Sequence, residues 1–342
     1  MKTYTFWNNK GGTGKTSLCF QTVLQYAKQH PEQQILVIDL CPQANLSELM
    51  LGGMLGNGAS NLISLWTNNQ QPRRTIGGYF HDHLPSAHMM FNGFNANNYI
   101  CHPHAYNRNV PNNISLVAGD SYVELLANSI AAQASIILPV GDAYLLVLRW
   151  VIDFLDSLRG NDTYQMVFID TNPSFAIYTQ MAIAAADELI IPVTADSSSV
   201  RALHNVLALV YGINPNANNL NYSFYTKVVN SPNIQLPRIN SIVRNRLTQY
   251  MRRPASAYRA VLDSLSTLSN SLRQQYGNYF CPNFNIIDIR DFNTVGQIAY
   301  AEAKRFADIN AGRHIIGGRP IQANQQYISD CHNTILQLVG NL

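Results

Sequence analysis

A glycine loop near the start of the chain, Lys10-Gly11-Gly12-Thr13-Gly14-Lys15-Thr16, constrains the fold more than any other feature. Glycines let backbone N–H groups close around phosphate oxygens, while the lysine and hydroxyl that end the loop serve the outer phosphates and a magnesium ion. A β-prone run at 3–8 precedes the loop, and apolar residues at helical spacing follow it over 16–29. This order points a helix N-terminus at the phosphates, so the sequence predicts a nucleotide site.

The loop departs from the common phosphate-loop pattern at its front. Asn9 stands where the first glycine is usually found, and Lys10 adds a second lysine beside it. A lysine at this point brings charge that the phosphate cradle itself does not need. We therefore expect Lys10 to serve a neighbouring subunit.

Three later segments extend the pattern and identify a family resemblance. They read ILVIDLCPQANL from Ile35, MVFIDTNPS from Met166 and DELIIPV from Asp187. In their order and spacing, the loop and these segments resemble the ParA/MinD ATPases with a deviant Walker A motif, which position plasmids, chromosomes and other cargo. The resemblance covers residues 1 to about 200, is looser over 220–305, and hardly extends to 52–112.

The resemblance implies a homodimer that encloses ATP and Mg²⁺, with Lys10 reaching the partner's nucleotide and Lys15 holding the β- and γ-phosphates. It implies catalytic roles for Lys10, Lys15, Asp39 and Asp170, and magnesium at Thr16, Asp39 and Asp170. It implies nucleotide contacts from Lys10, Gly11, Gly12, Thr13, Gly14, Lys15, Thr16 and Ser17, and, by loose similarity, from Asn230 near the adenine. Non-specific DNA and a ParB-like or cargo adaptor protein are the partners that it implies.

One departure from the family concerns the attacking water. The second motif of the family carries a second aspartate that helps to orient this water, and Cys41 occupies that position here. A neutral thiol is a poor acceptor for a water proton, and phosphates would repel a thiolate. We therefore expect slow basal hydrolysis, unless Asn45 or Asn172 orients the water. Cys41 is equally well interpreted as a small buried residue at a strand end.

Basic residues gather in the last third of the chain. Residues 227–319 carry thirteen Lys and Arg against five Asp and Glu, whereas residues 1–226 carry ten against fourteen. Clustered arginine is typical of a protein that binds the phosphate backbone of DNA, although a solvated helix face would look the same. Apolar spacing predicts a helix over 237–251 with Arg238 on its solvent side. The DNA-binding candidates are Arg238, Arg244, Arg252 and Arg253.

Strand-like and helical runs alternate along the chain, which predicts an α/β fold with a doubly wound, mostly parallel sheet flanked by helices. Strands are expected near 3–8, 35–39, 114–118, 166–170, 188–193, 222–229 and 284–289. Helices are expected over 16–29, 120–134, 142–158, 175–186, 199–210, 237–251, 255–275 and 294–306. We interpret 1–342 as one P-loop ATPase domain, with an Asn-, Gly- and His-rich insertion at about 52–113 and a basic helical region at about 237–320.

Composition favours the cytoplasm, and the family resemblance implies association with the nucleoid. Five cysteines without paired spacing fit a reducing compartment, and no apolar run approaches the roughly 20 residues of a membrane span. The first strand begins at once, so we expect neither a signal peptide nor a preceding helix-turn-helix domain that would read DNA sequence. The C-terminal segment 321–342 is expected to be a packed helix, because it lacks the basic residues of a membrane-binding helix.

These observations support three hypotheses. The first is a ParA-like ATPase that dimerises with ATP, binds DNA without sequence preference and partitions a plasmid, a chromosome or other cargo. The second is an ATP-gated scaffold or sensor that hardly hydrolyses, because Cys41 replaces the aspartate. The third is a MinD-like membrane-positioning ATPase, against which the acidic C-terminal helix counts. Histidines at 81, 83, 88, 102 and 104 with Cys101 do not match a common zinc spacing.

Overall fold

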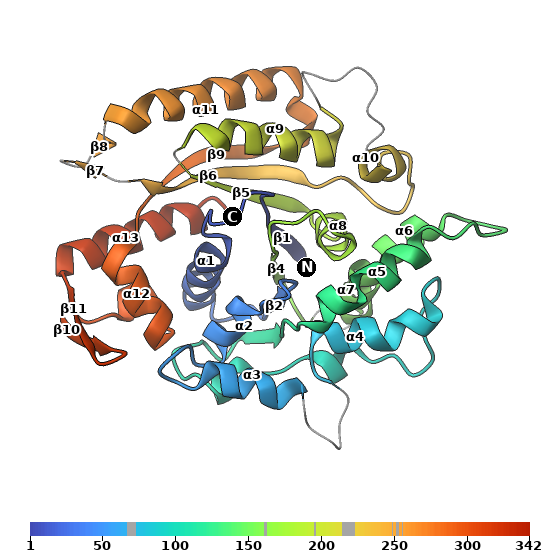
Figure 1. The fold of residues 1–342 in the computed structure, drawn as a ribbon, viewed down its shortest axis with the longest axis horizontal. Helices are drawn as coiled ribbons and strands as arrows, with labels where there is room; N and C mark the ends of the chain where they lie inside the picture. Colours follow the sequence, from blue (N-terminus) through green and yellow to red (C-terminus); the bar gives the residue numbers. More distant parts are fainter. Residues whose placement is uncertain are drawn as a thin grey trace.

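A seven-stranded sheet forms the centre of the structure, a computed structural model that describes residues 1–66, 73–160, 163–194, 196–213, 223–247, 249–250, 253–254 and 256–342. The strand order is β3-β2-β4-β1-β5-β6-β9, and each of these neighbouring pairs is parallel (Figure 1). The strands are β1 (Lys2–Phe6), β2 (Ile35–Asp39), β3 (Ile114–Val117), β4 (Met166–Asp170), β5 (Glu188–Thr194), β6 (Arg238–Leu247) and β9 (Phe280–Arg290). This architecture confirms the predicted fold class.

Helices cover both faces of the sheet, so its central strands are buried on two sides. In β2, Ile35 and Val37 join one apolar core, while Leu36 and Ile38 join the other, as the two-residue period of a strand requires. The Ile35 face packs against α1 (Lys15–Gln29), α2 (Asn45–Met50), α3 (Gly58–Trp66), α12 (Asn293–Glu302) and α13 (Gln325–Val339). The opposite face packs against α4 (Ile76–His83), α5 (Tyr122–Ala134), α6 (Ala143–Leu148), α7 (Trp150–Arg159), α8 (Ile177–Ala184), α9 (Ser197–Tyr211), α10 (Ser223–Val228) and α11 (Ser256–Gln275).

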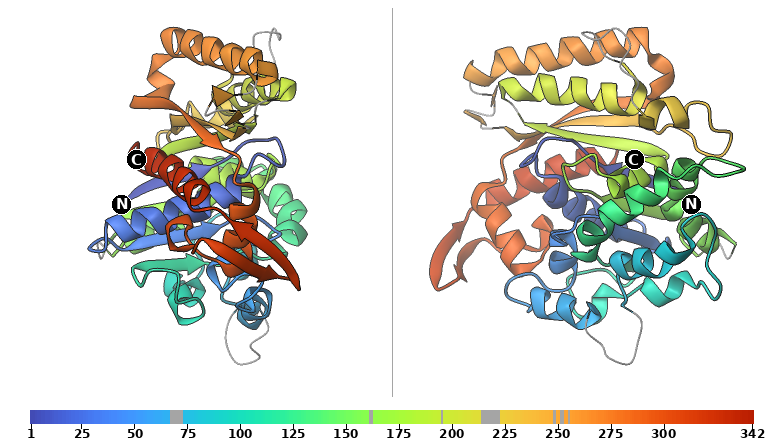
Figure 2. Two further views of the ribbon diagram at one scale, coloured as in Figure 1. Left: turned by 90° about the vertical axis from the view of Figure 1, so that its left-hand side faces the viewer. Right: turned by 45° about the vertical axis from the view of Figure 1, so that its right-hand side comes forward.

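Short elements complete the fold. Two antiparallel pairs lie outside the main sheet, β7 (Gln249–Tyr250) with β8 (Arg253–Pro254) and β10 (Gly312–Ile316) with β11 (Arg319–Ala323). The β10–β11 hairpin projects from the body of the molecule (Figure 2). The 3₁₀ turns are η1 (Leu84–Ser86), η2 (Ala96–Tyr99), η3 (Pro103–Ala105), η4 (Gly277–Tyr279) and η5 (Phe306–Asp308).

Two predicted elements are wrong, and they are neighbours in the sequence. Residues 222–229 were expected to be a strand, but Ser223–Val228 form helix α10. Residues 237–251 were expected to be a helix, but Arg238–Leu247 form strand β6 between β5 and β9. The apolar residues Ile239, Ile242 and Val243 fit both periods, and their β-branched side chains favour the buried strand. The predicted helix 142–158 is also divided, because α6 ends at Leu148 and α7 begins at Trp150.

The segment 52–113 packs into the body of the protein. It contains the short helices α3 and α4. Tyr79 lies 5.1 Å from Phe154 of α7, measured between ring centroids, and Tyr99 packs against the same ring. Isolated bridges, Thr75 to Ala118 among them, tie the segment to the end of β3. The segment has no long helix or strand with a regular apolar face, and aromatic side chains anchor it to the core instead.

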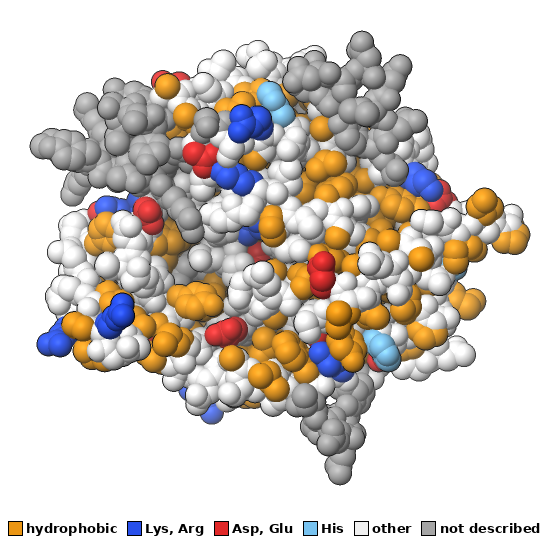
Figure 3. All heavy atoms as spheres, viewed as in Figure 1, with side chains coloured by type: hydrophobic (Ala, Val, Ile, Leu, Met, Phe, Trp, Pro, Cys, Tyr) orange, Lys and Arg blue, Asp and Glu red, His pale blue; other side chains and the backbone are white. Residues whose placement is uncertain are grey.

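The C-terminal helix is packed as expected. Its apolar face is buried against α1 and β9, through Ile328, Cys331, Ile335, Leu338 and Val339. Among the described residues, no helix is both long and apolar enough to cross a membrane. The face drawn in Figure 3 carries few, scattered charged side chains among uncharged polar and hydrophobic ones, in keeping with the low charged content of 13%.

His83 has a buried place in the aromatic cluster. Its ring stacks on Trp150 at 4.4 Å between centroids and is 2% exposed. Neither ring nitrogen has a hydrogen-bond partner in the part of the chain that the structure describes. Burial therefore lowers the pKa of His83 to about 4. Within the described residues no group of three His, Cys, Asp or Glu side chains could hold a metal ion.

We expect His83→Phe to make the protein less sensitive to acid. Between about pH 6.5 and pH 4 the unfolded chain binds a proton at His83 that the folded protein excludes, so the free energy of unfolding falls as pH falls. Phenylalanine keeps the stack without the titration, and should recover about 2–3 kcal/mol of this loss at pH 4. Urea unfolding of both proteins at pH 7 and pH 4 measures the difference. An equal acid loss in the variant would show that His83 does not contribute.

Candidate nucleotide site

The glycine loop joins β1 to α1 and forms one wall of an open cleft. Gly12 and Gly14 adopt positive φ angles of 72° and 82°, which side chains with a Cβ rarely tolerate. A Cβ on Gly14 would also lie 2.2 Å from the Asn245 amide nitrogen. The cleft has a volume of about 690 Å³ and is lined by residues 11–17, Cys41, Pro42, Gln43, Asn45, Glu124 and residues 171–174. The loop thus has the shape and the position of a phosphate cradle at the carboxyl ends of the strands.

The two lysines of the loop have different surroundings. Lys15 is 6% exposed, and its ammonium group donates to the carbonyl oxygens of Asn8 and Lys10, at 3.2 Å each. Burial lowers the pKa of Lys15, although the nearby Asp170 opposes that effect. The Lys10 ammonium group instead donates to Thr194 at 2.8 Å and forms an ion pair with Asp196. Lys15 therefore points into the loop, whereas Lys10 is held at the end of β5.

Two carboxylates lie side by side beneath the loop. Asp39 ends β2 and Asp170 ends β4, the two residues are paired in the parallel register, and both are fully buried. Asp39 accepts hydrogen bonds from the Ser47 amide and hydroxyl, each at 2.8 Å, and from the Cys41 amide. One oxygen of Asp170 accepts from the Thr16 hydroxyl at 2.7 Å. Burial raises the pKa of both carboxyl groups, and Asp39 raises that of Asp170 further.

This arrangement fits a divalent cation. The second oxygen of Asp170, Oδ1, is buried and has no hydrogen-bond partner among the described residues. Carboxylate and hydroxyl oxygens are the ligands that Mg²⁺ prefers, and Mg²⁺ usually binds through one or two carboxylates together with substrate phosphates. Thr16 and Asp170 are placed to contact such an ion, while the hydrogen bonds of Asp39 suit a role behind them. The structure thus brings together the three residues for which we expected a magnesium role.

Cys41 lies at the edge of the cleft as a neutral thiol. It is 7% exposed, and burial beside Asp39 and Asp170 raises its pKa to about 12. The group therefore cannot accept a water proton near neutral pH. The side chain of Asn172 is turned to its own loop, because its oxygen accepts from Ser174 at 2.8 Å and its nitrogen donates to Tyr178 at 2.7 Å.

A second cavity, of about 560 Å³, adjoins the loop at Gly14 and Ser17. Asn245, at the end of β6, lies between the two, and its amide donates to the Thr13 carbonyl at 2.9 Å. Asn230 lines neither cavity; it follows α10, and its amide donates to the carbonyl of Thr226. The strand expected at 222–229 is helix α10, so Asn230 does not follow a strand, whereas Asn245 lies near the end of strand β6. The other walls are Met54, Asp291, Phe292, Asn293, Gly296, Gln297, Tyr300, Ala301, Ile316 and Ile321.

The arginine candidates do not form one surface. Arg244 makes an internal ion pair with Asp288 and also donates to the Leu262 carbonyl and the Ser266 hydroxyl. Its donors are therefore engaged within the protein, contrary to a free DNA-binding role. Arg238 is exposed at the start of β6, whereas Arg253 follows its far end. Ten residues of strand separate these ends by about 30 Å.

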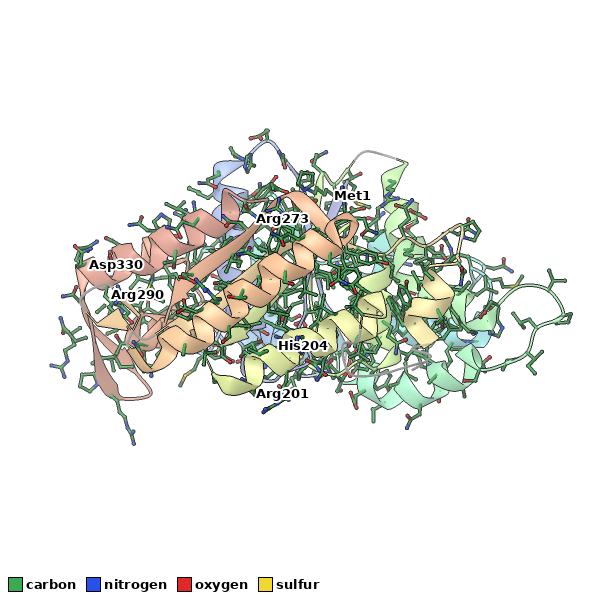
Figure 4. All side chains as sticks on the ribbon, turned by 90° about the horizontal axis from the view of Figure 1, so that it is seen from above. Met1, Arg201, His204, Arg273, Arg290 and Asp330 are labelled. Atoms are coloured by element: carbon green, nitrogen blue, oxygen red, sulfur yellow. The ribbon has the colours of Figure 1, made fainter. Side chains whose placement is uncertain are left out.

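Sequence reasoning missed another exposed arginine. Arg201 lies in α9 with His204, away from Met1 and the amino-terminal ends of the strands (Figure 4). Arg201 has no hydrogen bond or ion pair to another described residue. Arg252 lies outside the described residues, as do the side chains of Arg246, Arg253 and Arg259. Arg201 is an isolated basic residue on a largely apolar helix, so a search for clusters of arginine and lysine in the sequence does not find it.

We expect Asp170→Asn to stabilise the nucleotide-free protein. Because burial raises the pKa of Asp170 above its unfolded value, the folded protein binds the extra proton and loses stability as pH rises above about 4. The amide keeps an acceptor for Thr16 without the buried charge, which should add about 1–3 kcal/mol to the free energy of unfolding at pH 8.5. The variant should also lose the stabilisation that magnesium and ATP give to the wild type.

Urea unfolding with and without magnesium–ATP measures both effects. Asp263→Asn, which removes an exposed carboxylate of α11, is the matched control and should leave stability and ligand response unchanged. A lower free energy of unfolding for Asp170→Asn than for the wild type would contradict our view that the buried charges of Asp39 and Asp170 destabilise the folded protein.

Comparison with known proteins identifies a family. A family model described as an AAA domain matches residues 1–222. A virulence plasmid ParA family protein of Chlamydia psittaci, pGP5-D, is 23% identical over 272 residues, which cover 79% of this chain and 87% of that protein.

Solved structures share the fold at low sequence identity. An ATP complex of McdA from Cyanothece aligns with a TM-score of 0.64 at 14% identity, over 100% of this chain and 96% of that one. A putative plasmid partition protein from Borrelia burgdorferi, bound to AMPPNP, aligns with a TM-score of 0.55 at 17% identity, over 98% and 97%. Together with the glycine loop and the paired aspartates, these matches place the chain in the AAA-domain family, as a P-loop ATPase of the ParA/MinD type.

Proposed function

We propose that this protein is a ParA-like ATPase that binds ATP with Mg²⁺, dimerises, binds DNA without sequence preference and is released by hydrolysis. The observation that carries the proposal is the unpartnered Asp170 oxygen beneath a glycine loop with a buried lysine. A cation satisfies the carboxylate, and a nucleotide phosphate satisfies Lys15 and the cation together. The cellular role that follows is partitioning of a plasmid, a chromosome or other cargo, with a ParB-like or cargo adaptor, at the nucleoid in the cytoplasm.

Lys10 supports the dimeric part of the proposal. Its ammonium group is held by Thr194 and Asp196 of the same chain rather than by the loop. Hydrogen bonds from Lys10, Ser198 and Thr194 lower the pKa of Asp196 against the opposing effect of partial burial. In a dimer, Lys10 exchanges Asp196 for a phosphate of the partner's nucleotide. We therefore propose that the contact between Lys10 and Asp196 is temporary, and that another anion can replace Asp196.

The DNA surface that we propose lies at the carboxyl-terminal end of β6. Arg253 in β8 follows that end, and register pairs the ends of β5 and β6, from which α9 and Arg201 continue. Arg238 is at the other end of β6, and Arg244 is internally paired. A MinD-like membrane role receives less support, because the C-terminal helix buries its apolar face and has Asp330 without a lysine or arginine after Arg319.

Replacing Arg252 and Arg253 by alanine should weaken ATP-dependent DNA binding and reduce its salt dependence. Each arginine that contacts a phosphate contributes about one unit to the slope of log affinity against log salt. Fluorescence anisotropy with a labelled duplex, in a salt series with ATP and Mg²⁺, gives the slope. Arg238→Ala and Arg159→Ala are matched controls that should leave the slope unchanged. A slope insensitive to the double variant would remove these arginines from the DNA surface.

A second candidate function, an ATP-gated scaffold with little hydrolysis, is favoured by Cys41 alone. Its buried thiol, with a pKa of about 12, stands where the family has the aspartate that orients water. Such a protein would switch on binding ATP and reset by exchange rather than by hydrolysis. Turnover in the purified protein, with and without DNA, separates the two functions.

Cys41→Asp should raise the rate of phosphate release by about 10-fold or more, because it supplies an acceptor for the water proton. Cys41→Ser, similar in size but uncharged, should stay at the wild-type rate. The measurement is steady-state phosphate release at saturating magnesium–ATP. Rapid hydrolysis by the wild type would eliminate the scaffold, whereas an unchanged rate in Cys41→Asp would show that this position does not limit turnover.

A further inference from the structure

The cleft contains a carboxylate that the sequence motifs do not include. Among the described residues that line it, Glu124 of α5 is the sole acidic residue; Asp39 and Asp170 are fully buried below it. We propose that Glu124 supplies the carboxylate that positions the attacking water and accepts its proton, in place of the aspartate that Cys41 replaces. The assignment rests on the ATPase function proposed above and names a residue for its hydrolytic step.

The other side chains of the cleft cannot take this role. Cys41 is a weak hydrogen-bond acceptor, and an amide such as Gln43 or Asn45 can orient a water but cannot accept its proton. The Asn172 oxygen already accepts from Ser174 and Thr179. Among the described side chains that line the cleft, Glu124 is therefore the one whose carboxylate can accept the proton.

A chain of hydrogen bonds links Glu124 to the loop that follows Asp170. The Tyr178 hydroxyl donates to Glu124 Oε2 at 2.8 Å and accepts from the Asn172 amide at 2.7 Å. The other oxygen of Glu124, Oε1, has no hydrogen bond to a described residue. Tyr178 thus fixes the orientation of the carboxylate and leaves one oxygen for a water. Through Oε2, Tyr178 and Asn172 connect the carboxylate of Glu124 to the loop that begins after Asp170.

The segment 73–78 holds the start of α5, on which Glu124 lies. Asp120 is fully buried, accepts from the Thr75 hydroxyl at 2.6 Å and is paired with the Arg73 guanidinium. Its other contact is to the backbone amide of Tyr122, the first residue of α5, at 3.0 Å. The charge-assisted bonds from Arg73 orient the Asp120 carboxylate, which in turn accepts from the first turn of the helix. Through Arg73 and Thr75, the segment 52–113 therefore helps to position the helix that carries Glu124.

The reaction is hydrolysis of ATP to ADP and inorganic phosphate. The water oxygen forms a bond to the γ-phosphorus, and the bond from that phosphorus to the β–γ bridging oxygen breaks, with its electron pair leaving on ADP. The water proton passes to Glu124 and from there to the phosphate or solvent. Lys15 holds the phosphates, so Glu124 contributes through the water and not through nucleotide affinity.

The test compares turnover with nucleotide affinity. Glu124→Gln keeps an acceptor for Tyr178 but loses the proton acceptor, so kcat should fall by about 10-fold or more. The affinity for a non-hydrolysable ATP analogue should stay the same or rise, because a negative charge near the phosphates is gone. Glu124→Asp should retain part of the rate, and Tyr178→Phe should cause a smaller fall. Glu32→Gln, an exposed glutamate beyond α1, should match the wild type.

A double variant separates this role from a structural one. If Glu124 does the work of the missing aspartate, Cys41→Asp should raise kcat by a larger factor in the Glu124→Gln background than in the wild type. Wild-type turnover in Glu124→Gln, or equal factors in the two backgrounds, would overturn the role of Glu124 and leave the ATPase function standing. A wild type that binds ATP with no turnover at all would overturn both.

Discussion

The structure depends on two aspartates that the sheet forces together. Parallel pairing of β2 with β4 places Asp39 opposite Asp170 at the strand ends, where both are fully buried. Two buried carboxylates repel each other and resist ionisation, and burial raises the pKa of both. Serine and threonine hydroxyls relieve part of this cost, but Asp170 Oδ1 remains without a partner. The folded chain is thus prepared for a cation, and the cation in turn attracts phosphate.

Much of this site could be predicted because its chemistry is local in the sequence. The glycine loop, Asp39 and Asp170 each follow a short apolar strand, and parallel strands bring their carboxyl ends to one edge. Asn245 and Glu124 could not be found in this way. Each reaches the site through its element's place in the fold, Asn245 from the end of β6 and Glu124 from the first turn of α5. Neither stands in a motif.

The misassigned element shows how a local period can mislead. Residues 239, 242 and 243 recur at helical spacing, yet in β6 they lie on both faces: Ile239 and Ile242 join one core, and Val243 joins the other. A strand buried on two sides needs no alternation of polar and apolar residues, so its sequence can imitate a helix. The error placed Arg238 on the solvent side of a helix, whereas it is the first residue of the strand. Burial between β5 and β9 decided the outcome, and that is a property of the whole sheet.

The proposed exchange of Lys10 onto a partner's nucleotide requires that its contact with Asp196 be weak. The Lys10 side chain is 25% exposed and that of Asp196 is 45% exposed, so water screens their attraction, and pairs of this kind are worth about 0–1 kcal/mol. A triphosphate with several negative oxygens offers Lys10 a stronger partner at small cost. Lys15 differs, because it is buried against backbone carbonyls that no anion replaces without filling the loop. In the proposed function, lysine therefore has a fixed place in the phosphate loop at position 15 and an exchangeable contact at position 10, and the two positions differ in burial.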